Sequence, residues 1–389
     1  MLEELRVDNF KSLINVTFRP QDRNLLLGVN NAGKTTLCHV LRFLSSTTRR
    51  PLEGAAEGTT GTRFAIGNRY LKKTTTDFVL KATLPFHEDT LVFDYELTIS
   101  VASPDSPAAA LEVDSERLRV SGGGFDNVLL FENTRDGVRL LHEGRHLRGE
   151  TAYAETSAPR DATMLNRLYD LEANARMNCF KTYLAQWTYY DFSTLALRKA
   201  DHYPGHRVLM TDGSNLSSVV FQLKTANERG YRELVRCLQE VDPTIDLINF
   251  QVPSANRVFM VFEDTEGNSL PVANASNGTL RFLALLYVLL VQPETGPCPL
   301  TIIEEPENCL YVGVLKPLLD AAEQSSTRSQ VIFTSHSPYF IDLFENDLNS
   351  IFVMKRGESH SSLTQPDISV VKDRLEKFPL GEMHFREML

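Results

Sequence analysis

The 389-residue sequence has little of what would place it in a membrane or in an oxidising compartment. Its longest apolar run, "LALLYVLLV" at 283–291, is far shorter than the roughly 20 residues that cross a bilayer. The first residues, "MLEELRVDNFKSL", carry acidic side chains where a secretory signal carries basic ones. Five cysteines form no C-x-x-C pair, so neither a disulfide framework nor a zinc ribbon is indicated. We therefore expect a cytoplasmic protein that makes no use of a membrane.

The chain also lacks an excess of positive charge. Its 40 lysines and arginines are outnumbered by 50 aspartates and glutamates, which gives a net charge of −10 at pH 7. This balance argues against a protein coated in nucleic acid, although one basic groove remains compatible with it. We find no internal repeat and no heptad pattern long enough for a coiled coil. The length then favours at least two globular lobes without long helical arms.

Hydrophobic periodicity divides the chain into three parts. Residues 1–148 begin with two strands and a helix from Lys34 to about Leu44, and they continue with period-two alternation. Residues 149–250 have mostly helical patterns, and residues 251–389 alternate apolar strands with helices. The sequence therefore predicts an α/β protein: an N-terminal lobe with an antiparallel β layer, a helical insertion, and a C-terminal α/β lobe.

The segment "LLLGVNNAGKTTL" contains the G-x-x-x-x-G-K-T pattern of a phosphate-binding loop, between an apolar strand and a helix. Small residues let backbone N–H groups turn toward the β- and γ-phosphates, and the helix N-terminus adds partial positive charge. Lys34 adds a full charge, and the hydroxyl of Thr35 is a ligand for Mg²⁺. The residues expected to bind ATP here are Gly28, Asn30, Asn31, Ala32, Gly33, Lys34, Thr35 and Thr36.

The segment "TIIEEPENCL" at 301–310 places acids at the carboxyl end of a short buried strand. Two adjacent carboxylates repel each other and resist desolvation, so they need a positive partner such as a metal ion. A phosphate-loop ATPase requires such acids beside its bound Mg²⁺. We expect Glu304 to hold the ion, directly or through water, and Glu305 to orient or deprotonate the attacking water.

Several stretches resemble one branch of these ATPases. "NASNGTLRFLAL" (274–285) resembles the signature segment of ABC-type ATPases, and "VIFTSHSP" (331–338) resembles their switch strand. The opening "LRVDNFKSL" with "GVNNAGKTTL" is similar to the start of SMC, RecF and OLD-family proteins. "IEEPENCLY", "YYDFSTLALR", "TDGSNLSSVVFQL" and "PLGEMHF" resemble stand-alone OLD-like ATPases in particular. The resemblance covers nearly the whole chain and implies an ABC-type ATPase head.

The resemblance also implies roles and partners. In this class ATP is sandwiched between two heads, so we expect a homodimer or a larger homo-oligomer. Ser276, Gly278 and Thr279 would contact the γ-phosphate held by the other protomer. His336 would contact the γ-phosphate and the lytic water, and Asn308 falls where a loop crosses the dimer interface.

The sequence departs from the family at Tyr311 and Val312, where His-Pro is usual, and the role of that loop stays open. For the glutamine that senses Mg²⁺ in ABC ATPases, Gln186 in "LAQWTYYDF" is a candidate.

Three functions remain open. The first is an ATP-driven switch subunit that dimerises on ATP and governs a separately encoded effector, a nuclease or a toxin, in bacterial anti-phage defence. Full-length OLD proteins carry a Toprim nuclease domain after the ATPase, and we expect the 53 residues after His336 to be too few for one. The second is a RecF-like DNA-binding ATPase of repair or replication, with basic stretches at Arg49–Arg50, Arg69–Lys73 and Arg198–Lys199. The third is a nucleotide-gated scaffold that hydrolyses almost no ATP. The presence of Glu305, a residue suited to activating water, argues against this third function.

Two histidine pairs have the spacing of zinc ligands. "HEGRH" at 142–146 matches H-E-x-x-H, but Gly144 lies inside it and its flanks alternate like hairpin arms. "HYPGH" at 202–206 contains Pro204, which is incompatible with a helix. We predict that both segments are loops without zinc.

Overall fold

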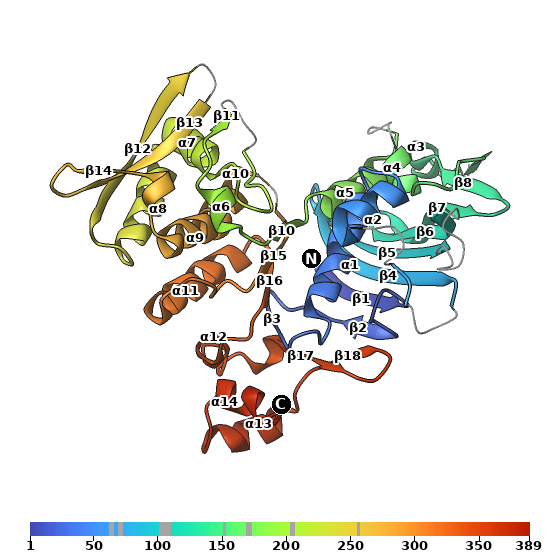
Figure 1. The fold of residues 1–389 in the computed structure, drawn as a ribbon. Helices are drawn as coiled ribbons and strands as arrows, with labels where there is room; N and C mark the ends of the chain where they lie inside the picture. The colour runs from blue at the N-terminus through green and yellow to red at the C-terminus, as the bar shows by residue number, and fades with distance from the viewer. Residues whose placement is uncertain are drawn as a thin grey trace. The chain divides into compact units, whose positions relative to one another are not determined.

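The computed structural model describes residues 1–61, 66–68, 73–100, 110–150, 153–168, 173–202, 207–254, 257–296 and 298–389. They form two compact units, each assembled from separate stretches of the chain (Figure 1). Unit 1 comprises Met1–Gln21, Gly28–Trp187 and Phe352–Gln365, and unit 2 comprises Asp22–Leu27, Thr188–Ile351 and Pro366–Leu389. The three lobes with boundaries at 148 and 250 stay a prediction.

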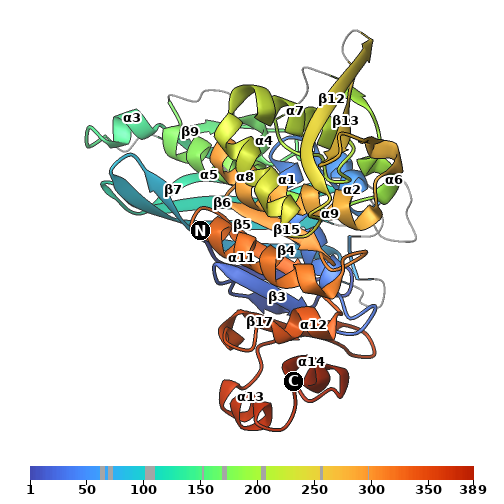
Figure 2. The same cartoon turned by 90° about the vertical axis from the view of Figure 1, so that its left-hand side faces the viewer.

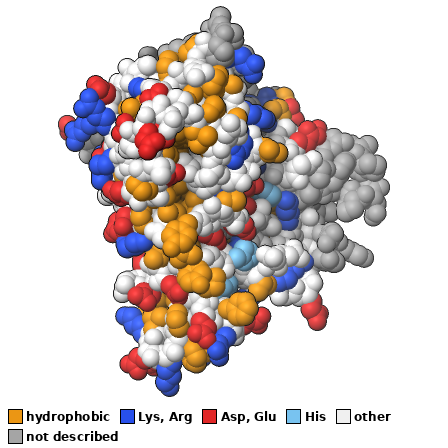
Figure 3. Space-filling model, turned by 60° about the vertical axis from the view of Figure 1, so that its left-hand side comes forward, with side chains coloured by type: hydrophobic (Ala, Val, Ile, Leu, Met, Phe, Trp, Pro, Cys, Tyr) orange, Lys and Arg blue, Asp and Glu red, His pale blue; other side chains and the backbone are white. Residues whose placement is uncertain are grey.

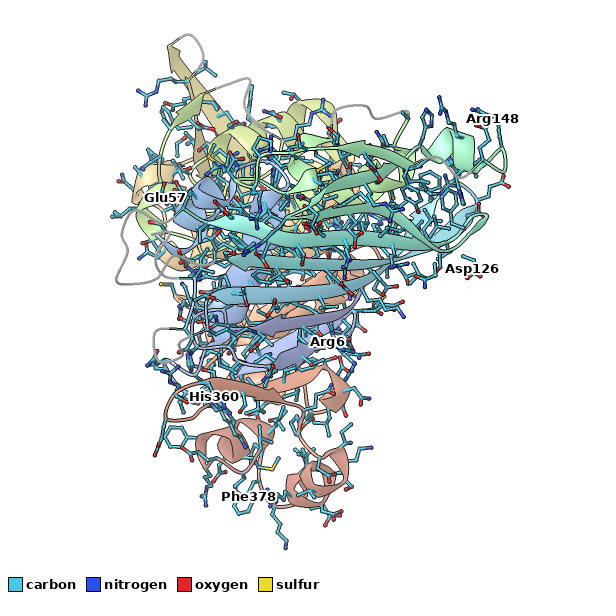
Figure 4. All side chains as sticks on the ribbon, turned by 90° about the vertical axis from the view of Figure 1, so that its right-hand side faces the viewer. Arg6, Glu57, Asp126, Arg148, His360 and Phe378 are labelled. Carbon is cyan, nitrogen blue, oxygen red and sulfur yellow. The ribbon has the colours of Figure 1, made fainter. Side chains whose placement is uncertain are left out.

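Unit 1 is built on the predicted antiparallel sheet, which Figure 4 shows face-on. Its strand order is β2-β1-β4-β5-β6-β7-β8-β9, and every neighbouring pair is antiparallel. The strands are β1 (Leu2–Asp8), β2 (Val16–Phe18), β4 (Thr75–Phe86), β5 (Asp89–Ser100), β6 (Glu112–Gly122), β7 (Phe125–Thr134), β8 (Gly137–Leu141) and β9 (Tyr153–Thr156). The period-two alternation of the sequence therefore becomes a sheet with one apolar face.

The apolar face of this sheet packs against two helices through aromatic side chains. Phe43 of α1 (Lys34–Thr47) contacts Phe78 of β4 with ring centroids 5.7 Å apart. Phe180 of α5 (Ala175–Ala185) lies 5.2 Å from Phe93 of β5. Each of these four side chains is at most 1% exposed, and the burial of each contributes roughly 1.5–3 kcal/mol of transfer free energy. The sheet thereby holds α1, the helix that the phosphate loop opens.

The remaining elements of unit 1 are short. The opposite face of the sheet is polar, and Arg6, labelled in Figure 4, forms an ion pair there with Glu4. The other helices are α2 (Leu52–Thr60), α3 (Glu143–His146) and α4 (Met164–Arg167). From Phe352 on, the unit also contains the hairpin formed by β17 (Ile351–Arg356) and β18 (Ser361–Thr364).

Unit 2 contains a parallel sheet in the order β10-β15-β16-β3. Its strands are β3 (Arg23–Leu27), β10 (Thr188–Tyr190), β15 (Leu300–Glu304) and β16 (Gln330–Thr334). Glu304 pairs in register with Thr334, and Thr334 with Leu26. Because parallel strands end at the same edge, the acidic strand, the switch strand and the strand that leads into the phosphate loop terminate side by side. The predicted strand at 300–303 is confirmed.

Helices and a small second sheet complete unit 2. Helix α11 packs on β16 and β3, and Figure 2 shows it in front of the parallel sheet. The antiparallel strands are β11 (Asp201–His202), β12 (Ile245–Ser254), β13 (Arg257–Asp264) and β14 (Ser269–Pro271). The helices are α6 (Thr194–Leu197), α7 (Leu216–Ala226), α8 (Glu228–Gln239), α9 (Asn277–Leu286), α10 (Gln292–Thr295), α11 (Leu315–Ser326), α12 (Pro338–Asp342), α13 (Ile368–Leu375) and α14 (Leu380–Phe385).

Short turns of other helical types lie between these helices. The 3-10 turns are η2 (Val272–Asn274), η4 (Val312–Val314) and η5 (Leu348–Ser350). Helix α9 continues into a π-helical turn, η3 (Tyr287–Val291). The apolar run at 283–291 is thus shared between two helix types. Within the described ranges, none of the helices has both the length and the apolar character that a bilayer crossing requires.

The prediction that "HEGRH" is a loop is wrong. Glu143–His146 form the four-residue helix α3, because the buried carboxylate of Glu143 accepts hydrogen bonds from the backbone N–H groups of Arg176 and Met177. The guanidinium of Arg176 lies 3.5 Å from the same carboxylate. Glu143 is therefore an internal anchor of unit 1. "HYPGH" lies largely outside the described residues, and the described part of the chain holds no cluster of three or more His, Cys, Asp or Glu suited to a metal.

Candidate functional site

The phosphate loop leaves β3 at Leu27 and ends where α1 begins at Lys34, so the predicted strand–loop–helix order is confirmed. The helix runs three residues further than the predicted end at Leu44. The predicted loop residues differ in exposure. Three are exposed (Asn30, Asn31 and Thr35), three are buried (Gly28, Ala32 and Lys34), and two are half-buried (Gly33 and Thr36).

Two glycines give this loop its shape. Gly28 has φ +151°, and a Cβ there would lie 2.5 Å from the carbonyl oxygen of Met354. Gly33 has φ +113°, and a Cβ there would lie 2.9 Å from Oγ of Ser361. Both conformations favour glycine, and both positions lack room for a side chain. The β17–β18 hairpin therefore forms a wall of the loop, which the sequence analysis missed because Met354 and Ser361 lie far away in the chain.

Positive charge gathers at the start of α1. The Lys34 side chain is 6% exposed, and its ammonium group donates to the carbonyl oxygens of Gly28 at 2.7 Å and Val29 at 3.4 Å. Gly33 caps the helix without a side chain, and the first helical turn carries no acidic residue. Backbone N–H groups at a helix start together with a lysine provide a binding site for an anion such as a phosphate group.

In unit 2, the acidic strand brings Glu305 and His336 together. Glu305 follows the end of β15 with φ +44°, a left-handed conformation that is uncommon for a side chain of this size. One carboxylate oxygen accepts from Nδ2 of Asn308 at 2.6 Å, and the other lies 3.5 Å from Nε2 of His336. Its backbone N–H donates to Oγ1 of Thr334 at 3.2 Å. The carboxylate is thus held between two polar side chains while remaining partly open to solvent.

Glu307 is a residue to which the sequence analysis gave no role. Its Oε1 accepts hydrogen bonds from the hydroxyl of Ser335 at 2.5 Å and from the backbone N–H groups of His336 at 3.1 Å and Ser337 at 3.2 Å. The third carboxylate of "EEPE" therefore binds the segment that carries His336, the predicted switch residue. The only signal for it in the sequence was its place in the motif.

The predicted signature segment forms the start of α9. Ser276 is the N-cap residue, and its Oγ accepts from the backbone N–H of Thr279 at 3.0 Å. The hydroxyl of Thr279 donates to Asp242 at 3.1 Å. A Cβ at Gly278 would lie 2.9 Å from the carbonyl oxygen of Cys309, in the loop after the acidic strand. The helix start and the acidic loop are therefore in close contact within unit 2.

Arg281 is a second missed residue, and it joins α9 to the acidic strand. Its guanidinium donates to the carbonyl oxygens of Phe192 at 2.9 Å, Glu304 at 3.3 Å and Glu305 at 2.9 Å. Burial lowers the pKa of Arg281, although nearby acidic groups, including Asp191, act to raise it. A single arginine in a run of apolar residues is the signal that could have identified it, since a buried arginine needs acceptors.

The predicted site residues thus fall into two groups. Unit 1 holds the whole phosphate loop, and unit 2 brings together the predicted signature, acidic and switch residues, which are Ser276, Gly278, Glu304, Glu305 and His336. The two predicted magnesium ligands, Thr35 and Glu304, belong to different units. Leu27 and Gly28, where the chain passes from one unit to the other, link the groups covalently.

Residues 23–342 match the model of a family described as "AAA domain, putative AbiEii toxin, Type IV TA system". No curated protein matches the chain. Among solved structures, an SMC head bound to the C-winged helix domain of ScpA is similar, with a TM-score of 0.56 and 13% identity over 96% of this chain and 99% of that one. An SMC head with an extended coiled coil, derived from Pyrococcus furiosus and bound to the C-terminal domain of ScpA, has a TM-score of 0.50 and 12% identity over 97% and 98%. The predicted fold class, an ABC-type ATPase head, is confirmed.

Proposed function

The chain belongs to this AAA-domain family, and we propose that it is an ATPase that binds ATP with Mg²⁺, hydrolyses it, and joins a second copy of itself around the bound nucleotide. The observation that carries the proposal is Glu305, held by Asn308 and His336 at the carboxyl end of a strand in the sheet from which the phosphate loop departs.

The phosphate loop suits a triphosphate. The absence of a Cβ at Gly28 and Gly33 leaves a cradle of backbone, and Lys34 supplies the charge that phosphate oxygens require. Thr35 and Glu304 would hold the magnesium ion, which neutralises phosphate charge when bound. A loop without this lysine, or with side chains in the cradle, would fit the group poorly.

The acidic loop suits the activation of water. Glu305 would orient the attacking water and accept its proton, a contribution that is typically worth 10²–10⁴ in rate. Asn308 and His336 limit the directions in which its carboxylate points, since each faces one of its oxygens. His336 would contact the γ-phosphate group of the bound nucleotide and the attacking water.

The start of α9 supports a head-to-head dimer. Ser276 and Asn277 at this helix start are exposed, and the partial positive charge of a helix N-terminus favours a phosphate group, here one held by another protomer. The loop after Asn308 exposes Tyr311 by 80% and Val312 by 46%. Figure 3 shows one face of the molecule on which hydrophobic side chains gather in the middle and lower part. Exposed apolar groups of this kind are typical of contact surfaces.

We expect Ser276→Arg to prevent the ATP-dependent dimer while leaving ATP binding by the phosphate loop of the same chain within about two-fold of wild type. An arginine at the cap removes the acceptor for Thr279 and fills the space into which the other protomer's phosphate would fit. The measurement is molar mass by light scattering with a non-hydrolysable ATP analogue. Ser193→Arg, which changes the N-cap serine of α6, is the matched control. A wild-type protein that stays monomeric with the analogue would contradict the dimer but leave hydrolysis open.

The proposed biological role is that of a switch for a separately encoded effector, a nuclease or toxin, in bacterial anti-phage defence. The family description, which names a toxin of a toxin–antitoxin system, and the OLD-like stretches of the sequence support this setting. An adjoining gene for a Toprim-like or toxin-like protein would add support. A position in a replication or repair operon would favour the alternative.

The alternative is direct DNA binding of the RecF type. Of its proposed basic residues, Arg69 and Lys72 lie outside the described residues, and two of the others are engaged in contacts within the chain. Lys73 is paired with Asp8 and Asp77 at 2.6 Å each, and Arg198 donates to the loop before α9 and to Asn277. We therefore expect little or no affinity for duplex DNA at 50 mM salt in a fluorescence-anisotropy titration. Binding that is tight and falls steeply as salt rises would instead favour direct DNA contact.

A further inference from the structure

The segment between β16 and α12, Ser335–Ser337, is held by a single carboxylate oxygen. Glu307 Oε1 accepts from the Ser335 hydroxyl and from the backbone N–H groups of His336 and Ser337, all within 3.2 Å. We propose that Glu307 is a positioning residue that sets the place of His336 relative to Glu305, an inference that rests on the proposed ATPase function.

The two glutamates contact different parts of His336. Glu305 faces the imidazole ring, with 3.5 Å between Oε1 and Nε2, whereas Glu307 binds the backbone N–H of the same residue at 3.1 Å. Both glutamates belong to one short loop, in which Pro306 restricts the backbone between them. Because few rotatable bonds separate the two glutamates, loss of the Glu307 contact is expected to change the distance between Glu305 and the imidazole of His336.

The backbone N–H of His336 donates directly to this carboxylate. Helix α12 has Ser337 as its N-cap residue without a side-chain cap, and Pro338 begins the helix. The hydroxyl of Ser335 accepts from the Ser337 N–H at 3.0 Å but itself donates to Glu307. Without Glu307, the backbone N–H of His336 loses this acceptor, and with it one restraint on the distance between the histidine and Glu305.

Glu307 acts on the segment that carries His336. The hydrogen bonds that its Oε1 accepts come from Ser335, His336 and Ser337, and the residues proposed to bind ATP belong to a different part of the chain, the phosphate loop. Loss of Glu307 is therefore expected to affect turnover rather than nucleotide affinity. Misplacement of a catalytic group by about 1 Å costs on the order of 100-fold in rate.

The test compares Glu307→Ala, Glu307→Gln and the control Glu323→Gln, an exposed position on α11. We expect Glu307→Ala to lower kcat by roughly 100-fold with the Kd for an ATP analogue within two-fold of wild type. Glu307→Gln keeps an acceptor oxygen in place, so its kcat should lie between those of wild type and the alanine variant. Hydrogen–deuterium exchange over residues 335–343 should rise in the same order, with the control unchanged.

Unaltered kcat and exchange in Glu307→Ala would overturn the proposal, and so would faster exchange spread evenly over the whole chain, which indicates a general loss of stability. If Glu307→Ala does not fold, the glutamine variant carries both measurements. If the wild-type protein does not hydrolyse ATP, the proposed function fails, while the exchange data still decide whether Glu307 holds the switch segment.

Discussion

Replacing Lys34 by alanine is expected to abolish ATP binding at micromolar nucleotide concentrations. The lysine side chain is buried, and its ammonium group donates hydrogen bonds to the carbonyl oxygens of Gly28 and Val29 within the loop. Loss of this charge and its donors would cost about 3 kcal/mol, which raises the Kd on the order of 100-fold. Calorimetric titration with an ATP analogue measures the change.

Two further variants test whether the ammonium charge of Lys34, rather than the packing of its side chain, is needed for ATP binding. Lys34→Met keeps the buried apolar stem and removes only the ammonium group, so it should bind ATP as poorly as the alanine variant. Lys81→Ala removes an exposed lysine of β4 in the same unit and should bind like wild type. Wild-type affinity in Lys34→Met would show that the ammonium group has no part in nucleotide binding.

Replacing Glu305 by glutamine is expected to lower kcat by about 10²–10⁴ while ATP binding is unchanged. Glutamine has the same shape as glutamate and can still accept the hydrogen bond of Asn308, but it cannot take a proton from water. Because the nucleotide is then not cleaved, the ATP-bound dimer should accumulate. Steady-state turnover and molar mass in the presence of Mg-ATP test both expectations.

The matched control for this variant is Glu345→Gln, an exposed glutamate in the same unit. It should have wild-type turnover and the mass distribution of the wild type. If Glu305→Gln hydrolyses ATP as fast as wild type, Glu305 is not the base, whatever the behaviour of Lys34 variants. A slow variant that stays monomeric would separate catalysis from dimer formation.

Local patterns in the sequence were enough to predict the elements that carry the motifs. The strand before the phosphate loop, the helix from Lys34, the acidic strand and the cap at Ser276 all follow from periodicity and capping within a few residues. "HEGRH" is the instructive failure. Gly144 and the alternating flanks favour a loop, but the bonds between the Glu143 carboxylate and the start of α5 stabilise a helical turn.

The amino-acid sequence by itself determined the chemistry available to this protein, because a phosphate loop and a pair of acids after an apolar strand are local features of the chain. The tertiary structure alone decided which distant groups complete them. Glu307 reaches the backbone of His336 across 29 residues, Arg281 joins α9 to the carbonyl groups of the acidic strand, and the β17–β18 hairpin closes on Gly28 and Gly33. Such contacts leave no periodic pattern in the sequence, because a hydrogen-bond partner is selected by proximity in the folded chain rather than by spacing along it.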